Sequence, residues 1–241
     1  MMRHRLKLLL VFVLASLSAC QGTEAGQETL TQHQSKQDTH HRLIIMGQDG
    51  SGSYELWDQA KQIAQQIITQ LNPGDIFYLR TITQTSYTDD STVFRLELPQ
   101  LPDDENHNPF DRRQKLRRKV YVLRSQALKK DARQRIDELK PIGAKKTDVY
   151  GFLAVASEKL AMNTTATERI VIIASDLRDN VRYRPELDLS AAHIAVVGFQ
   201  AMKDPRQTQQ LKNRWQTVFS KAGATKVNFI RTEEQFILSR F

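Results

Sequence analysis

The sequence predicts an α/β fold: a doubly wound, mostly parallel six-stranded sheet with one antiparallel edge strand and helices on both faces. Three observations predict it. Short apolar, β-branched runs alternate with longer segments whose apolar residues recur at helical spacing. Turn and cap signals separate these segments, as in Asn-Pro-Gly-Asp at 72–75 and Asp-Pro at 204–205. The run 93–98 alternates apolar and polar residues, which is typical of a half-exposed edge strand.

The elements are expected in the order β-α-β-β-α-α-β-β-α-β-α. The expected strands are 42–46, 76–82, 93–98, 169–174, 193–199 and 227–230. The expected helices are 54–71, 112–139, 147–162, one that Asp204 and Pro205 start and Gly223 ends, and a short final one that begins at the capping box of Thr232 and Gln235. In 112–139, one apolar face is predicted from Leu116, Val120, Leu123, Ala127, Leu128, Ile136 and Leu139. In a doubly wound sheet, a ligand site lies beyond the carboxyl ends of the strands.

The first 19 residues have the pattern of a secretory signal, with basic residues, an apolar stretch at 8–17 and small residues before Cys20. Leu17-Ser18-Ala19-Cys20 resembles the lipobox of bacterial lipoproteins, in which the cysteine becomes the acylated N-terminus. An ordinary signal peptide with a chance cysteine is the alternative. Residues 20–41 are polar and aperiodic, and predict a flexible tether for a domain at 42–241.

The lipobox resemblance implies a lipid-anchored protein of the cell envelope that faces the periplasm. Gln21 is not the Asp that often retains such proteins at the inner membrane, so the outer membrane is favoured. A single cysteine excludes an intrachain disulfide framework and a Cys-rich metal site. With 40% hydrophobic residues and no apolar run of 18, the chain is not a polytopic membrane protein.

Three polar loops are expected at the carboxyl edge of the sheet. The first strand runs into Asp49-Gly50-Ser51-Gly52-Ser53, the helix 147–162 opens at Thr147-Asp148, and the strand 169–174 ends in Ser175-Asp176. Their hydroxyl and carboxylate oxygens, without sulfur or imidazole, suit a hard cation such as Mg²⁺. Any one of these residues alone is more often a helix cap or a turn residue.

Taken in this order on this pattern of elements, these residues resemble the metal-ion-dependent adhesion site of von Willebrand factor A-type domains, over about 42–241. The resemblance implies a Rossmann-like fold, in which the hydroxyls bind a divalent ion (Mg²⁺, or Mn²⁺ or Ca²⁺) and the acids act directly or through water. A partner protein's Asp or Glu completes the shell. The implied metal residues are Asp49, Ser51, Ser53, Thr147 and Asp176. Asp148 matches an acid that often follows the Thr.

One departure from the family bears on the path of the third loop. The family often has Thr-Asp-Gly there, whereas this chain has Ser175-Asp176-Leu177. The resemblance implies a membrane-anchored binding or adaptor lipoprotein that captures a partner's carboxylate and is not an enzyme.

An envelope hydrolase or a nucleotide- or phosphate-binding enzyme on the same loops is the alternative. Gly47-x-x-Gly50-x-Gly52 suggests a phosphate cradle, but it lacks the Gly-Lys-Ser/Thr of a P-loop and contains Asp49.

The predicted helix 112–139 is strongly basic. Residues 111–135 carry 11 basic side chains and two acids. Such a surface suits anionic lipid, lipopolysaccharide phosphates or an acidic partner, and a solvated helix face is the alternative. Nucleic acid is not expected in an exported protein with so few interleaved aromatic residues. The candidate residues are Arg112, Arg113, Lys115, Arg117, Arg118 and Lys119.

Overall fold

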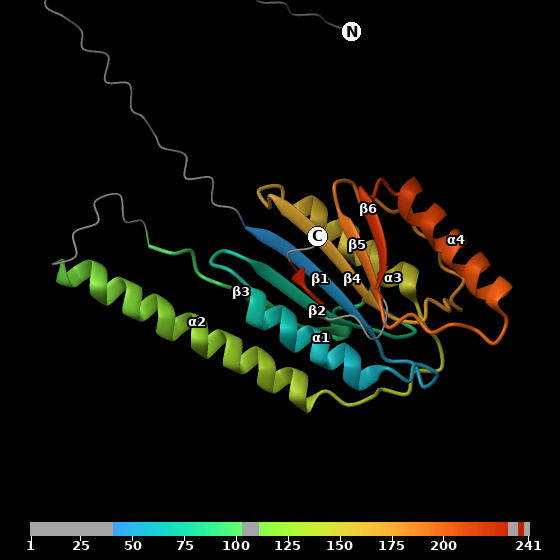
Figure 1. Cartoon of the computed structure of the whole chain (residues 1–241), viewed down its shortest axis with the longest axis horizontal. Coiled ribbons are helices and arrows are strands. Elements are labelled where there is room, and N and C mark those ends of the chain that lie inside the picture. Colours follow the sequence, from blue (N-terminus) through green and yellow to red (C-terminus); the bar gives the residue numbers. More distant parts are fainter. Residues whose placement is uncertain (1–40, 103–110, 231–235, 239–241) are drawn as a thin grey trace, which may run out of the picture. The chain divides into compact units, whose positions relative to one another are not determined.

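The structure is a computed structural model that describes residues 41–102, 111–230 and 236–238 (Figure 1). These residues belong to one compact unit, Asp38–Phe241. The expected signal segment, Cys20, the tether up to residue 40 and the start of the final short helix lie outside the described residues. Among the residues described, no helix is both long enough and apolar enough to span a bilayer.

The described part of the chain forms a six-stranded sheet in the order β3-β2-β1-β4-β5-β6. Neighbouring strands are parallel, except that β3 at the edge runs antiparallel to β2. The predicted fold class is confirmed. The strands are β1 (Arg42–Asp49), β2 (Ile76–Ile82), β3 (Thr92–Glu97), β4 (Glu168–Ala174), β5 (His193–Val197) and β6 (Lys226–Ile230).

Helices cover both faces of this sheet (Figure 1). One face packs against α1 (Trp57–Gln70) and α2 (Arg112–Glu138), and the other against α3 (Val149–Met162) and α4 (Pro205–Lys221). Successive side chains of a strand point to opposite faces. Ile44 therefore packs in the core under α1 and α2, while its neighbour Ile45 packs in the core under α3 and α4.

The prediction of a single apolar face on α2 is wrong. Leu116, Val120 and Leu123 are 62%, 55% and 55% exposed, whereas Ala132 and Ile136 are buried against the rest of the domain. At 100° per residue, the two sets form separate stripes about 175° apart, on opposite sides of the helix axis. Only the stripe in the C-terminal half of α2 contributes to the core.

A buried ion pair ties β1 to the turn that precedes β2. Arg42 Nη2 lies 2.6 Å from Asp75 Oδ2, and the Arg42 Nε–H donates to the same oxygen at 3.0 Å. Asp75 Oδ1 accepts from the backbone N–H of Arg42 at 2.8 Å, and Asp75 Oδ2 also accepts from the N–H of Asn72 at 2.7 Å. Because both carboxylate oxygens have donors, the buried charge is compensated.

The connection between the parallel strands β4 and β5 contains no helix. Residues 175–192 run as an irregular segment, although a crossover of this kind usually carries a helix. Leu177 and Leu189 are buried in the core on the α3 and α4 side, which holds both ends of the segment against the sheet. An irregular connection of this length is uncommon within a compact domain.

Candidate metal site

Asp49 is the last residue of β1 and is completely buried. Its Oδ1 accepts a hydrogen bond of 2.9 Å from the backbone N–H of Ser51, and its Oδ2 accepts one of 2.6 Å from the hydroxyl of Ser175. Because β1 and β4 are parallel neighbours, their carboxyl ends meet at one edge of the sheet. Asp49 therefore joins the loop after β1 to the loop after β4.

The hydroxyl oxygens of Ser51 and Ser53 lie 3.3 Å apart. Ser51 is buried and Ser53 is exposed, so the pair reaches from the end of the sheet to the surface. Two oxygens on neighbouring vertices of an octahedron lie about 3.0 Å apart when each is about 2.1 Å from the metal. The pair is spaced closely enough to serve as neighbouring ligands of one Mg²⁺-sized ion.

Asp176 follows β4 and is 1% exposed. Its Oδ1 accepts a hydrogen bond of 2.9 Å from the backbone N–H of Arg178. Its Oδ2 is buried and accepts no hydrogen bond, and the nearest cation is Arg178 Nε at 3.4 Å. The Arg178 side chain is 45% exposed, so solvent weakens this ion pair. Asp176 is thus a buried carboxylate with one oxygen left for another electrophile.

Leu177 adopts the left-handed backbone conformation, with φ of 59°, although it is not a glycine. A leucine in this region is strained by about 1–2 kcal/mol. Its side chain is fully buried in the core, and its carbonyl accepts a hydrogen bond of 2.9 Å from Trp215 Nε1. These contacts hold the residue after Asp176 in a conformation that glycine adopts freely, so the loop turns here without a glycine.

Thr147 and Asp148 precede α3 and contact the segment that follows β4. The backbone N–H of Thr147 donates to Asn180 Oδ1 at 2.8 Å, and the N–H of Asn180 donates to the Thr147 carbonyl at 3.1 Å. Asp148, rather than Thr147, is the N-cap of α3, because its Oδ1 accepts from the N–H of Gly151 at 2.8 Å. Thr147 is buried just outside the helix. Asp148 therefore has a structural role of its own.

A short β-bridge links this segment to the loop after β1. Ser51 pairs with Ala144, the N–H of Gly52 donates to the Ala144 carbonyl at 3.1 Å, and the N–H of Ala144 donates to Gly50 at 3.0 Å. The three predicted loops are thus joined by hydrogen bonds at one edge of the sheet. Hydrogen bonds connect Asp49 with Ser51, and the Ser51 and Ser53 hydroxyls lie side by side. Asp176 adjoins Asp49 through its neighbour Ser175, and Thr147 is connected through Ala144 and Asn180.

Burial raises the pKa of both predicted metal-site carboxyls. For Asp49, desolvation is the largest cause, hydrogen bonds from Ser175 and Ser51 oppose it, and the charge of Asp176 adds to it. For Asp176, desolvation also outweighs the hydrogen bond and charge of Arg178. Two desolvated carboxylates that repel each other are stabilised when a cation binds between them.

The donor set fits a hard divalent cation. It combines two carboxylates with hydroxyl oxygens, and one buried carboxylate oxygen accepts no hydrogen bond. In the described part of the chain, no group of three or more His, Cys, Asp or Glu residues is placed to hold a metal. A cation here would take neutral oxygens and water for most of its shell, which is the habit of Mg²⁺.

Tyr54 is a residue of this site that the sequence did not indicate. It is buried, and the charges of Asp49 and Asp176 add to burial in raising the pKa of its phenol. A side chain at Gly198 would come within 2.3 Å of the Tyr54 Oη, so the close approach depends on that glycine. In the sequence, the position of Tyr54 directly after Ser53 was the only feature that could have indicated its place in this site.

The glycine-containing loop is not arranged as a phosphate cradle. The N–H of Gly50 donates to the Ile82 carbonyl at 2.9 Å, that of Ser51 to Asp49, and that of Gly52 to the Ala144 carbonyl. A phosphate cradle needs backbone N–H groups that point at the ligand, and these three already have acceptors.

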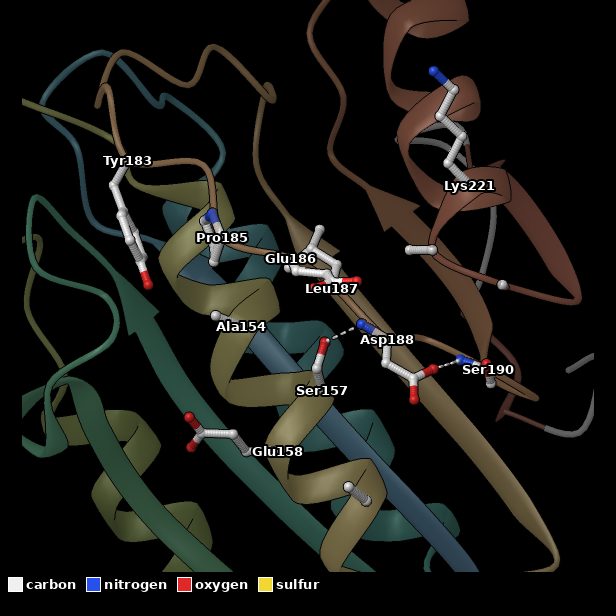
Figure 2. Close-up of a pocket in the computed structure, with 13 residues that line it drawn as sticks. Ala154, Ser157, Glu158, Tyr183, Pro185, Glu186, Leu187, Asp188, Ser190 and Lys221 are labelled. Carbon is white, nitrogen blue, oxygen red and sulfur yellow. Dashed lines mark hydrogen bonds between the residues drawn. The ribbon is translucent and has the colours of Figure 1, made fainter.

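A hollow lies away from these loops, between α3, the irregular segment 175–192 and the C-terminal end of α4 (Figure 2). Its volume is about 760 Å³. The N–H of Asp188 donates to the Ser157 hydroxyl at 3.2 Å, and Asp188 Oδ1 accepts from the N–H of Ser190 at 3.0 Å, as Figure 2 shows. Ser157 and Ser190 lie toward the C-terminus of α3 and the start of β5, so the hollow is near the amino ends of the strands. It is not the metal site.

The candidate cations of the basic surface lie on a different element. Arg112, Arg113, Lys115, Arg117, Arg118 and Lys119 are all exposed in the N-terminal half of α2. None of them is part of the loops at the carboxyl edge of the sheet.

No protein-family model matches the chain, and no curated protein matches it. Among solved structures, it is similar to proximal thread matrix protein 1 from the mussel byssus with a zinc-occupied MIDAS motif, at 15% identity and a TM-score of 0.46, over 80% of this chain and 44% of that one. It is also similar to a von Willebrand factor type A structure from Catenulispora acidiphila, at 16% identity and a TM-score of 0.45, over 80% and 38%.

An aerotolerance-related membrane protein from Bacteroides fragilis matches at 12% identity and a TM-score of 0.41, over 80% of this chain and 90% of that one. The chain spans less than half of the length of the mussel and Catenulispora proteins. Identities and TM-scores this low transfer no ligand and no function. In the topology of its sheet and the placement of its Asp49-x-Ser51-x-Ser53 loop, the chain resembles a von Willebrand factor A-type domain.

Proposed function

We propose that this chain is a lipid-anchored binding protein of the cell envelope that captures a carboxylate of a partner protein through a divalent cation. The observation that carries the proposal is the buried Asp176 Oδ2, which accepts no hydrogen bond although it belongs to a desolvated carboxylate beside Asp49. The residues that would hold the cation are Asp49, Ser51, Ser53, Thr147 and Asp176.

The hydroxyl oxygens and the carboxylate oxygens of this site have different roles. The hydroxyls of Ser51 and Ser53 are neutral ligands near the surface, whereas both oxygens of Asp49 already accept hydrogen bonds inside the protein. A bound divalent cation supplies a Lewis-acid position for an anionic oxygen. A partner's Asp or Glu carboxylate is anionic, so it would bind the cation more strongly than the neutral water that it displaces at the exposed position beside Ser53.

Membrane anchoring makes a weak contact of this kind sufficient. We propose that Cys20 carries the lipid and that the domain faces the periplasm, with the outer membrane favoured over the inner. A tether of about 21 residues spans roughly 25 Å. Confinement to the membrane surface raises the effective concentration of the domain for a partner that is also in the envelope.

Metal binding is tested first by thermal unfolding of the purified full chain in EDTA and then in Mg²⁺, Mn²⁺ or Ca²⁺. A site filled at 100 times its Kd stabilises the native state by about 2.7 kcal/mol. In a domain of this size that raises Tm by roughly 5 to 10 °C. Ser53→Ala removes one exposed hydroxyl and is expected to abolish most of the rise.

Ser220→Ala is the matched control, because Ser220 is an exposed serine of α4, far along the chain from the three loops. It is expected to keep the full rise in Tm. Equal shifts in both variants, or no shift in the native chain with any of the three ions, would contradict a metal site at these loops.

Carboxylate capture is tested on the same chain with Mn²⁺ as the ion and acetate as the probe. Acetate is expected to displace water from the bound Mn²⁺, which electron paramagnetic resonance and water proton relaxation both detect. If Mn²⁺ binds but its spectra do not respond to acetate, carboxylate capture is contradicted, whereas the metal site itself is supported.

A further inference from the structure

The N-terminal half of α2, residues 112–124, concentrates positive charge on an exposed helix. It carries seven Lys and Arg side chains and no acid, and the carboxylate of Asp111, the residue before the helix, caps its N-terminus. Figure 1 shows that this half of α2 extends past the strands of the sheet. The side-chain contacts of α2 with α1 come from its other half, where Lys129 and Arg133 reach the C-terminal end of α1.

The same half of α2 also exposes an apolar stripe. Leu116, Val120 and Leu123 follow each other at helical spacing, are 62%, 55% and 55% exposed, and point away from the buried stripe of the helix. By their angles around the axis, Arg112 and Lys119 flank one side of this stripe. Arg113 and Arg124 flank the other side. An apolar stripe between two rows of cations is the pattern of a helix that lies in a membrane interface.

An apolar hollow continues from this stripe toward the segment after β3. It has a volume of about 370 Å³ and lies between α2 and residues 99–102. Its walls include Pro99, Pro102 and Val120, and Arg117 and Arg124 stand among its lining residues. Apolar walls beside guanidinium groups match an amphiphile that has an anionic headgroup and a hydrocarbon chain.

We infer that the N-terminal half of α2 docks onto the surface of an anionic lipid bilayer, with Leu116, Val120 and Leu123 entering the interface and the cations contacting lipid phosphates. A second copy of this chain does not fit, because seven like charges would face seven others. An acidic protein would match the charge. However, the apolar stripe runs between the cations along an open helix, which suits a flat, laterally mobile anionic surface better than a folded partner.

The test places an environment-sensitive fluorophore on the stripe. The full chain with Leu123→Cys is labelled and reconstituted in vesicles of phosphatidylcholine alone or with phosphatidylglycerol. The native chain, taken through the same labelling, gives the background from Cys20, and a label at Gln207→Cys on the exposed surface of α4 is the positional control. A blue shift is expected for residue 123 only, and only with phosphatidylglycerol.

Charge variants separate headgroup binding from insertion driven by the label. Arg112→Gln, Arg113→Gln and Lys115→Gln together are expected to lower the ratio of docked to free helix roughly 100-fold. Lys203→Gln, Arg206→Gln and Arg214→Gln change the net charge equally and are expected to leave that ratio unchanged. All six positions are exposed, and circular dichroism checks that both triple variants remain folded.

An unchanged spectrum at residue 123 with phosphatidylglycerol would overturn the inference. So would a shift with poly-glutamate but not with lipid, which would favour an acidic protein as the occupant. The docking does not depend on the metal site, because α2 contributes nothing to the three loops. The shift is therefore expected to persist in EDTA and in Ser53→Ala, so the two proposals fail independently.

Discussion

Removing the charge of Asp176 is expected to stabilise the metal-free protein and to abolish its response to metal. The carboxylate is 1% exposed, and its Oδ2 accepts no hydrogen bond. In Asp176→Asn the amide oxygen can still accept from the N–H of Arg178, while the buried charge is gone. The variant also loses the ion pair with Arg178, but this pair contributes little stability because the Arg178 side chain is half-exposed.

The stability that Asp176→Asn gains depends on pH, and the sign of this dependence follows from the pKa of Asp176. Burial raises the pKa of Asp176 in the folded state above its ordinary value of 3.8. The native state therefore binds the proton more tightly than the unfolded state, and stability falls as pH rises from 3.8 through the raised pKa. An uncompensated buried polar group costs about 1–3 kcal/mol. Asp176→Asn avoids this cost at high pH and gains nothing at low pH.

The assay is thermal unfolding of the full chain at pH 4 and pH 8, in EDTA and in Mg²⁺. At pH 8 in EDTA, Asp176→Asn is expected to melt roughly 2 to 12 °C above the native chain. With Mg²⁺ the order is expected to reverse, because only the native carboxylate gains from the cation. Asp90→Asn, at an exposed acid, is the control and should change neither result. A variant that is less stable than the native chain in EDTA at pH 8 would refute the reasoning from burial.

Two further predictions concern the scaffold of the site. Leu177→Ala is expected to cost about 2–5 kcal/mol in urea unfolding because it empties a buried position, and Leu177→Gly should be no less stable than the alanine variant, since glycine relieves the strain at φ 59°. A glycine variant clearly weaker than the alanine variant would show that the backbone is not strained. Asp75→Ala leaves Arg42 buried without its carboxylate and is expected to cost about 3–5 kcal/mol. Arg42→Leu with Asp75→Ala should recover part of that loss, which the same urea titration measures.

Local sequence determined the elements and the class of the fold. β2 was predicted at Ile76–Ile82 and is observed there, because a strand that is buried on both faces shows a run of apolar residues, here Ile76–Leu79, in the sequence. Asp204 and Pro205 marked the start of α4, and the Asp204 carboxylate does cap it by accepting from the N–H of Arg206. Helix caps and apolar runs depend on neighbours within one or two turns, so they can be read from the chain itself.

The motif Asp49-x-Ser51-x-Ser53 also depends on near neighbours, and its loop follows a strand as expected. The order of the elements already placed this loop with those of Thr147 and Asp176 at the carboxyl edge of the sheet, and resemblance to a family supplied the individual ligand roles. Whether these residues bind a cation stays a prediction.

Tertiary structure alone decided what surrounds those residues. Ser175 reaches Asp49 across 126 positions because β4 lies beside β1, and Tyr54 lies near both carboxylates because Gly198 leaves room for its ring. The two stripes of α2 carry the same kinds of side chain, and only the position of the helix against α1 determines that one stripe is buried and the other exposed. Burial, and with it the raised pKa of Asp176, arises from contacts between distant segments, which no local pattern in the sequence specifies.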